Sequence, residues 1–318
     1  GTSPVLRING ELVPLDYPPM TLEQIDATCE QILTPKQRKT FEQTNEVDFA
    51  FGVPGLARFR ANFYRQRGST AMVFRVIPFD PPKFEELNLP PIIKELALKP
   101  RGLVLVTGTV GSGKSTTLAA MVRIINESLR RNIITVEDPI EFLHKDNKSI
   151  ISQREVGSDT GSFHEALRHI LRQDPDVILI GEIRDQETMS IALTAANTGH
   201  LVLSTLHTVD AAQSINRIIS FFPLHQHQEI RFLLASSLQA VVSLRLIPRA
   251  DRQGRVPAVE VMVVTSTIKE YLMDPSRTHM IKTVIEESTT EYGMQSFDQS
   301  LLGLYSNCLL YTSPSPRD

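Results

Sequence analysis

The sequence lacks several features that would place it in a common class of protein. It has no tryptophan and only two cysteines, Cys29 and Cys308, too few for a disulfide framework. It contains no run of about 20 apolar residues, which a membrane-spanning helix requires. It also lacks an excess of positive charge, because 33 lysines and arginines stand against 36 acids, a net charge of −3. These absences favour a protein of the reducing cytoplasm that does not bind nucleic acid directly.

The residues that are present have the composition of an ordinary globular protein. The 318 residues are 41% hydrophobic and 22% charged, which suits about two domains with cores of their own. In the first part of the chain the patterns predict a hairpin at 5–15, a helix at 21–30 and strands at 47–51, 57–64 and 71–77. We therefore expect a small α+β domain at 1–78.

Composition then changes twice along the chain. Five prolines between Pro78 and Pro91 predict a stiff linker at 79–92, because proline fixes φ and is excluded from helix interiors and sheet ladders. After the linker, runs of consecutive apolar residues alternate with helical patterns, which is typical of a parallel sheet covered on both faces. We expect an α/β domain at 93–305. The predicted strands are 103–107, 132–136, 177–180, 201–205 and 256–264, and the predicted helices are 115–129, 162–173, 186–198 and 224–242.

The last residues, 306–318, differ from the rest. The segment SNCLLYTSPSPRD has neither a helical period nor a charged helix face. We hypothesise that this tail is foreign to the gene, and we assign no function to Cys308 within it.

A phosphate-binding pattern lies between the first predicted strand and helix of the α/β domain. Residues 108–116 read GTVGSGKST and fit G-x-x-x-x-G-K-[ST]. The glycines let backbone N–H groups curl toward phosphate at a helix N-terminus, which adds positive potential. Lys114 is expected to reach the β- and γ-phosphates of ATP, and the Ser115 hydroxyl to ligate Mg²⁺. The predicted nucleotide-binding residues are Gly108, Gly111, Ser112, Gly113, Lys114, Ser115 and Thr116.

Acidic residues follow two other predicted strands. Glu137 comes directly after Val136, and Glu182 follows the strand 177–180 after one glycine. Ligands of parallel α/β sheets bind at the carboxyl ends of the strands. Glu137 is therefore a candidate for polarising the attacking water, supported by Asp138 or Glu141, and Glu182 is a candidate Mg²⁺ ligand and catalytic acid of the site. The alternative is that these acids cap helices or form ion pairs.

Two histidines flank the predicted strand 201–205. His207 lies past its carboxyl end, and we expect it to reach the γ-phosphate of the nucleotide. His200 precedes the strand, and we expect it to contact the nucleotide as well, although its position gives it no obvious role. A purely structural role is the alternative for both.

These motifs, in this order, resemble those of the secretion and type IV pilus ATPases, and among them the PilT-like retraction motors. The resemblance covers residues 4–305. The segments that carry it are GTVGSGKST (108–116), ITVEDPIEFLH (134–144), QREVG (153–157), DPDVILIGEIRD (174–185), TGHLVLSTLHT (198–208) and GMQSFDQSLLGLY (293–305). It implies a PAS-like domain at 1–78 that lacks its first strand or helix, followed by a RecA-like ATPase domain. It also implies a homo-hexameric ring with ATP at the subunit boundaries.

By motif position, the resemblance also implies a role for two arginines of the N-terminal domain. Arg60 (in RFRAN) and Arg75 (in VFRVI) would approach the phosphates bound by a neighbouring subunit. An arginine that completes a phosphoryl-transfer site changes the rate by roughly 10³–10⁵. The alternative is that these arginines form the solvated face of a strand.

The function that the resemblance implies is ATP hydrolysis that drives type IV pilus retraction and twitching motility. The implied partners are an inner-membrane platform protein, which would hold the motor at the inner face of that membrane, and a paralogous ATPase. The alternative is a PilU-like accessory ring subunit that binds nucleotide and assists the principal motor, since 142–144 and 181–185 are also close to those paralogues. A secretion or assembly motor of the superfamily typically carries a four-cysteine zinc module, which two distant cysteines do not supply. A DNA translocase is disfavoured by the net charge.

Overall fold

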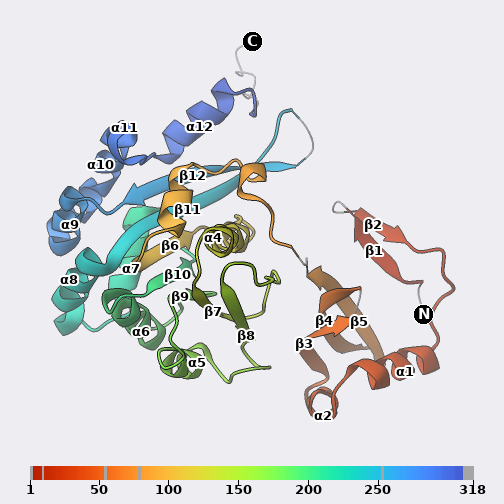
Figure 1. The fold of residues 1–318 in the computed structure, drawn as a ribbon. Coiled ribbons are helices and arrows are strands. Elements are labelled where there is room, and N and C mark those ends of the chain that lie inside the picture. Colours follow the sequence, from red (N-terminus) through yellow and green to blue (C-terminus); the bar gives the residue numbers. More distant parts are fainter. Residues whose placement is uncertain (1–2, 9–10, 54–55, 78–79, 252–253, 311–318) are drawn as a thin grey trace. The chain divides into compact units, whose positions relative to one another are not determined.

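The computed structural model describes residues 3–8, 11–53, 56–77, 80–251 and 254–310. The chain divides into two compact units, Gly1–Phe79 and Asp80–Asp318 (Figure 1). Much of the proline-rich segment 79–92 belongs to the second unit, where Phe84 and Leu89 are buried in a hydrophobic core.

The first unit is a small α+β structure. Its elements are β1 (Val5–Ile8), β2 (Glu11–Pro14), α1 (Leu22–Ile32), α2 (Pro35–Thr44), β3 (Glu46–Val53), β4 (Ala57–Gln66) and β5 (Ser69–Ile77). Strands β3, β4 and β5 form one antiparallel sheet in that order, and β1 pairs with β2 in a second. The turn of the predicted hairpin, at 9–10, lies outside the described residues. Both helices begin at a threonine capping box, Thr21 for α1 and Thr34 for α2.

The strand predicted at 57–64 is confirmed as part of β4, and its side chains alternate between two faces. Ala61 and Phe63 are fully buried in a core that also includes residues of α1 and α2. Arg60 points to the opposite, exposed face. Its register partner on β5 is Arg75, which is also exposed. The sheet therefore places these two guanidinium groups next to each other on one face.

The second unit contains the remaining helices and strands. These are η1 (Phe84–Glu86), α3 (Ile92–Ala97), β6 (Gly102–Thr107), α4 (Lys114–Ser128), β7 (Asn132–Glu137), β8 (Ile150–Glu155), α5 (Phe163–Ile170), β9 (Val177–Ile180), α6 (Gln186–Asn197), β10 (Leu201–Leu206), α7 (Ala211–Ser220), η2 (Leu224–Gln226), α8 (His227–Ser237), β11 (Leu238–Pro248), β12 (Arg255–Val263), α9 (Ser266–Met273), η3 (Pro275–Met280), α10 (Ile281–Glu287), α11 (Thr289–Tyr292) and α12 (Phe297–Ser306).

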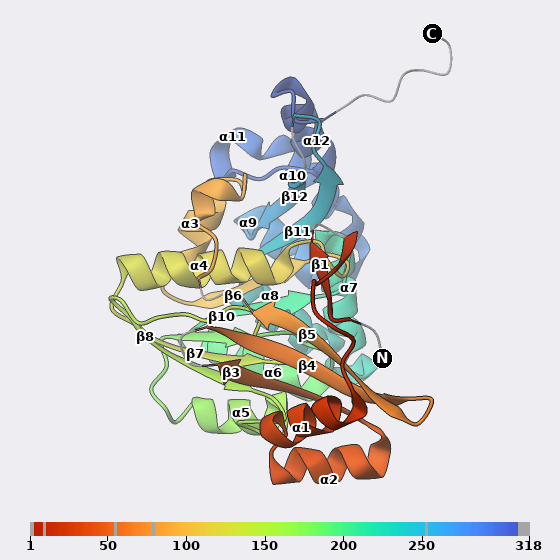
Figure 2. The same ribbon diagram turned by 90° about the vertical axis from the view of Figure 1, so that its right-hand side faces the viewer.

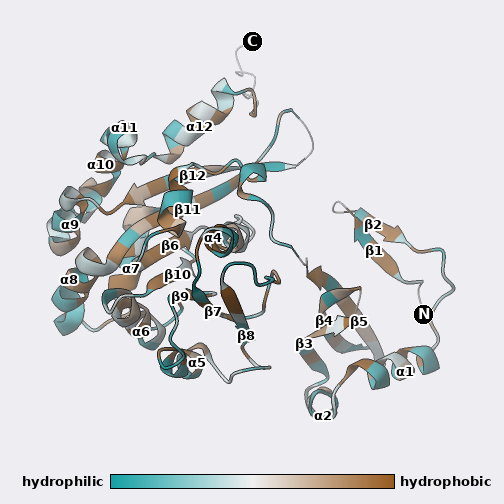
Figure 3. Cartoon of the chain, in the orientation of Figure 1, coloured by the Kyte–Doolittle hydropathy of each residue, from teal (hydrophilic) through white to brown (hydrophobic). Residues whose placement is uncertain are grey.

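A seven-stranded sheet forms the middle layer of this unit, in the order β12-β11-β6-β10-β9-β7-β8. Its neighbouring strands are parallel except β11 and β12, as the sequence predicts for an α/β domain. Successive residues of β6 enter different cores: Leu105 packs with α5 to α8, and Val104 packs with α3 and α4. Figure 2 shows α4 and α6 on opposite faces of the sheet, and Figure 3 shows that its central strands are predominantly hydrophobic.

One predicted helix is partly wrong. The helix expected at 224–242 ends at Ser237, and β11 begins at Leu238 and pairs with β6. The segment is apolar on both sides of this boundary, and periodicity alone does not separate a buried helix from a buried strand. Several further elements, among them α2, α3, β8 and α7, have no counterpart in the prediction.

The end of the chain is described only in part. α12 ends at Ser306, and the backbone N–H of Ala250 donates to Leu309 O at 2.9 Å. The rest of the tail that the sequence analysis singles out, 311–318, lies outside the described residues. No helix in the described part of the chain has both the length and the apolar character that crossing a membrane requires.

Candidate active site

The phosphate loop joins β6 to α4, and its backbone conformation requires glycine. Gly108 and Gly113 have φ angles of 141° and 100°, which L side chains rarely adopt. A Cβ atom on Gly108 would collide with Ser112 Oγ and would lie 2.5 Å from Leu244 O. Gly113 is the N-cap of α4, so the loop delivers its backbone N–H groups to the positive end of a helix.

Lys114, the first residue of α4, is held by the loop itself. Its Nζ donates to Gly108 O at 2.8 Å and to Thr109 O at 3.0 Å. Burial lowers the pKa of Lys114, and the nearby carboxylates of Glu182 and Glu141 oppose that effect. The buried ammonium thus lies on backbone carbonyls that phosphate oxygens can replace.

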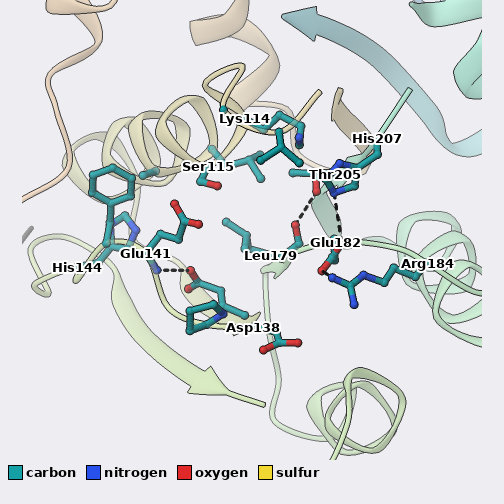
Figure 4. Close-up of a pocket in the computed structure, with 18 residues that line it drawn as sticks. Lys114, Ser115, Asp138, Glu141, His144, Leu179, Glu182, Arg184, Thr205 and His207 are labelled. Atoms are coloured by element: carbon teal, nitrogen blue, oxygen red, sulfur yellow. Dashed lines mark hydrogen bonds and ion pairs between the residues drawn. The ribbon is translucent and has the colours of Figure 1, made fainter. Parts of the chain in front are cut away.

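A pocket of ≈ 250 Å³ lies between this loop and the ends of the neighbouring strands (Figure 4). Residues predicted from separate segments line it together: Gly111, Lys114, Ser115, Glu137, Glu182 and His207. They meet there because β6, β7, β9 and β10 are parallel, so their carboxyl ends share one edge of the sheet. Asp138 and Glu141 line the same pocket.

The other predicted loop residues face a second space. Ser112, Gly113 and Thr116 line a pocket of ≈ 540 Å³ together with Leu89 and Leu246. Gly108 contributes its carbonyl to Lys114. The loop therefore separates a charged pocket from a more apolar one, an arrangement that suits the phosphates and the base of a nucleotide respectively.

Glu182 is two residues past the end of β9, and its side chain is only 12% exposed. One carboxylate oxygen, Oε1, contacts the Arg184 guanidinium, and the other lies 3.3 Å from His207 Nε2. The hydroxyl of Thr205, on β10, donates to Gly181 O at 2.7 Å and holds the chain just before Glu182. The carboxylate therefore has fixed cationic and imidazole neighbours at the edge of the pocket.

The oxygen donors in the pocket fit Mg²⁺. The Ser115 hydroxyl and the Glu182 carboxylate both line it, and Mg²⁺ prefers hard oxygen ligands. The described residues contain no group of three or more histidines, cysteines and acids that would hold a metal without further ligands. Mg²⁺ commonly binds through one or two protein oxygens together with substrate phosphates, and the donor set here suits that mode.

Glu137, the last residue of β7, has a largely buried carboxylate with two unequal oxygens. Oε1 accepts hydrogen bonds from Thr135 Oγ1 at 2.7 Å and from Gln153 Nε2 at 3.1 Å, whereas Oε2 has only a 3.5 Å contact from Glu141 N. Burial raises the pKa of Glu137, and these hydrogen bonds moderate the rise. A carboxylate in this state is suited to accept a proton from water.

Three of the predicted site residues lie in neither the phosphate loop nor this pocket. His200 precedes β10, so the six residues of that strand, about 20 Å of chain, separate it from His207. Its Nδ1 lies 3.0 Å from Ala195 O. Arg60 and Arg75 belong to the first unit, and neither has a hydrogen bond or ion pair with another described residue.

Three further residues, which lie in the pocket or bond to a residue that lines it, have no role predicted from the sequence. Arg184 pairs with Glu182, and His144 lines the pocket from the loop after β7. Burial lowers the pKa of His144 to about 4, so its imidazole is neutral at pH 7. Gln153 bonds to Glu137 from β8. All three lie in segments that carry the family resemblance, which is the one signal that points to them.

A phosphate loop after one strand of a parallel sheet, with acids after the neighbouring strands, defines a RecA-like P-loop ATPase. The model of the family described as "Type II/IV secretion system protein" matches residues 83–280. The chain belongs to this family.

Similar proteins include retraction motors. The chain is 44% identical, over 98% of its length and 89% of the relative's, to the type IV pilus retractation ATPase PilT of Pseudomonas aeruginosa. It is 43% identical to the type IV pilus ATPase PilU of the same organism, over 96% of the chain and 80% of PilU. A crystal structure of the pilus retraction motor PilT with bound ADP matches with a TM-score of 0.90 at 42% identity, over 100% of this chain and 92% of that one.

Proposed function

We infer that this chain is an ATP-hydrolysing motor that powers the retraction of type IV pili, and thereby twitching motility. One observation carries the inference. Lys114, Ser115, Glu137, Glu182 and His207 converge on one pocket in a chain that is 44% identical to a pilus retraction ATPase.

Each of these five residues has a role in the proposed hydrolysis of ATP. Lys114 leaves the carbonyls of its own loop and binds the β- and γ-phosphates, while Ser115 and Glu182 hold Mg²⁺. When bound, Mg²⁺ neutralises phosphate charge as it develops. Glu137 accepts the proton of the attacking water, and His207, which is within ion-pair distance of Glu182, contacts the γ-phosphate.

The proposed site is completed by a neighbouring subunit. We expect six copies of the chain to form a ring in which Arg60 and Arg75 of one subunit approach the nucleotide of the next. Support comes from the exposed position of both arginines as register partners and from the family membership of the chain. His200, which is remote from the pocket, is a candidate for contact across the same boundary.

The proposed location is the cytoplasmic face of the inner membrane. The ring would dock there on a platform protein of the pilus machine. The support is the identity to pilus motors.

The test is the dependence of Mg²⁺-ATPase activity on protein concentration. Wild type is compared with an Arg60→Ala, Arg75→Ala double variant, and with Arg67→Ala, an exposed residue between β4 and β5, as the matched control. A shared site requires specific activity that rises with concentration in wild type and the control and is lost in the double variant. Equal activity of all three chains would rule out the proposed role of the arginines.

A PilU-like accessory subunit is the second candidate, because the chain is 43% identical to PilU and 44% identical to PilT. Such a subunit would bind ATP and assist a principal motor. ATP binding without turnover at every protein concentration, together with turnover after a paralogous ATPase is added, would favour this role over that of the principal motor.

A further inference from the structure

The segment QREVG (153–157) has no part in the mechanism above. Its glutamine, Gln153, lies on β8, at one edge of the seven-stranded sheet. In the register of β7 and β8, Gln153 lies opposite Thr135, and Glu155 lies opposite Glu137. The edge strand therefore places an uncharged amide beside the carboxylate that is proposed to activate water.

The amide of Gln153 makes three hydrogen bonds in the structure. Its Nε2 donates to Glu137 Oε1 at 3.1 Å and to Phe142 O at 2.9 Å, and its Oε1 accepts from His144 N at 2.8 Å. A carboxylate and a carbonyl can only accept, and a backbone N–H can only donate. The three partners thus fix the orientation of the amide. Glutamate at this position would have no proton for either acceptor.

We propose that Gln153 is a positioning residue that aims the carboxylate of Glu137. The proposal rests on the proposed function, in which Glu137 accepts a proton from water. Gln153 and Thr135 together occupy Oε1 and so restrict rotation of the carboxylate. Oε2, whose one hydrogen bond is the 3.5 Å contact from Glu141 N, remains to receive the water. A base that is free to rotate loses much of its effect, because catalysis requires reacting groups placed to within a fraction of an ångström.

The loop that Gln153 contacts has other attachments. Glu155 Oε2 accepts from Ile140 N at 3.1 Å, and Asn126 Nδ2 donates to Lys145 O at 2.8 Å. Loss of the Gln153 amide therefore leaves both ends of this loop anchored. Loss of this amide should therefore affect the orientation of the Glu137 carboxylate and leave the fold of the pocket intact.

The test is a double-mutant cycle in the full chain, with kcat and KM for ATP measured in excess Mg²⁺. Gln153→Leu should lower kcat by about tenfold to a hundredfold, a part of the 10²–10⁴ that a general base supplies, with KM and ADP affinity within about twofold of wild type. In a Glu137→Gln background the same change should have almost no further effect, because the residue through which it acts is already disabled. Ser152→Ala, on the exposed opposite face of β8, is the matched control.

Each other result has a defined meaning. Equal fold losses from Gln153→Leu in both backgrounds, or a loss of ADP affinity, would overturn the positioning role and leave the proposed function standing. If Gln153→Leu lowers the melting temperature strongly, Gln153→Met, which has a similar length and no proton to donate to Glu137, is measured in its place and should show the same kcat loss. A wild-type chain that binds ATP without turnover overturns hydrolysis by this chain alone. The contact is then tested by hydrogen exchange of the His144 amide, which Gln153→Leu should accelerate and Ser152→Ala should not.

Discussion

Replacing Glu137 by glutamine should remove most of the ATPase activity and at the same time stabilise the protein. The carboxylate of Glu137 is largely buried, and burial raises its pKa despite the hydrogen bonds from Thr135 and Gln153. At neutral pH the fold must therefore hold a charge that the site does not favour. A glutamine side chain keeps an oxygen that can accept both hydrogen bonds and removes the charge.

The size of the two effects follows from the protonation of this one group. Loss of a general base lowers kcat by about 10²–10⁴. A rise of one in the pKa of Glu137 destabilises the folded state by about 1.4 kcal/mol at neutral pH. For a domain as large as Asp80–Asp318, this energy corresponds to about 3–5 °C in melting temperature. The advantage of the variant should shrink as pH falls through the raised pKa of Glu137 in the folded state, and it should vanish only below the ordinary value of 4.5, where the unfolded chain is protonated as well.

The assay combines phosphate release with thermal melts at several pH values between 5 and 8. Glu95→Gln is the matched control, because Glu95 is exposed on α3 and is not among the residues that line the pocket. The control should leave both kcat and the melting temperature unchanged. A Glu137→Gln variant that melts below wild type at pH 8, or that keeps its kcat, would refute the reasoning.

Three further substitutions test other parts of the pocket. Lys114→Ala should abolish turnover and weaken ATP binding by about tenfold to a hundredfold in a fluorescent-nucleotide titration, since a hydrogen bond to a charged group is worth about 1.5–3 kcal/mol. His144→Gln should protect the fold in acid. The pKa of this histidine falls from 6.5 to about 4 on folding, so wild type loses stability as pH drops through that range. Between pH 7 and pH 4 the free energy of unfolding of wild type, measured in urea, should fall by up to about 3 kcal/mol more than that of the variant. Arg184→Ala removes the ion pair to Glu182 Oε1, with which Mg²⁺ would compete for this oxygen. The Mg²⁺ concentration for half-maximal activity should therefore fall by about fivefold or less, because an exposed ion pair contributes only about 0.2–1 kcal/mol. An unchanged Mg²⁺ dependence would exclude competition between Arg184 and Mg²⁺.

The sequence predicts the parallel sheet well and its periphery less well. Strands β6 and β9 each contain at least four consecutive buried apolar residues, a pattern that is typical of the strands of a parallel sheet. β11 is also largely apolar, but it directly follows a helix, and nothing in the local pattern marks the change at Leu238. α2 was missed although Thr34, Pro35 and Gln37 form its capping box and first turn, which are recognisable signals. The residues at the start of α2 are therefore sufficient to predict that helix, whereas the start of β11 depends on its pairing with β6, which is distant in sequence.

The residues of the site likewise divide into those that local sequence predicts and those that it does not. Lys114, Ser115, Glu137, Glu182 and His207 were predictable because each is placed by a motif or by the end of a strand. Gln153 and Arg184 were not, since their roles depend on side-chain contacts between segments that are separate in sequence. For His200, the sequence predicts a contact that the fold of a single chain does not make. Its motif predicts a nucleotide contact, but its position before β10 puts it at the amino-terminal end of that strand, opposite to the end at which the pocket lies. A contact with nucleotide would therefore have to involve a second subunit.

Under the proposed function, the arginine pair of the first unit would couple nucleotide state to movement of that unit. Arg60 is flanked on its own sheet by Arg75 on one side and by Ala50 on the other, so that row contains two cations and no acid. Like charges directly opposite each other destabilise a strand pair, and an anion placed near both removes that cost. Under the proposed function the anion is the polyphosphate of a neighbour's ATP. Hydrolysis and phosphate release take away part of its charge, and the attraction for the arginine pair falls with it. Under this proposal, a first unit held by the attraction would be released when the nucleotide is spent, and the chemistry of the pocket would thereby be linked to its movement.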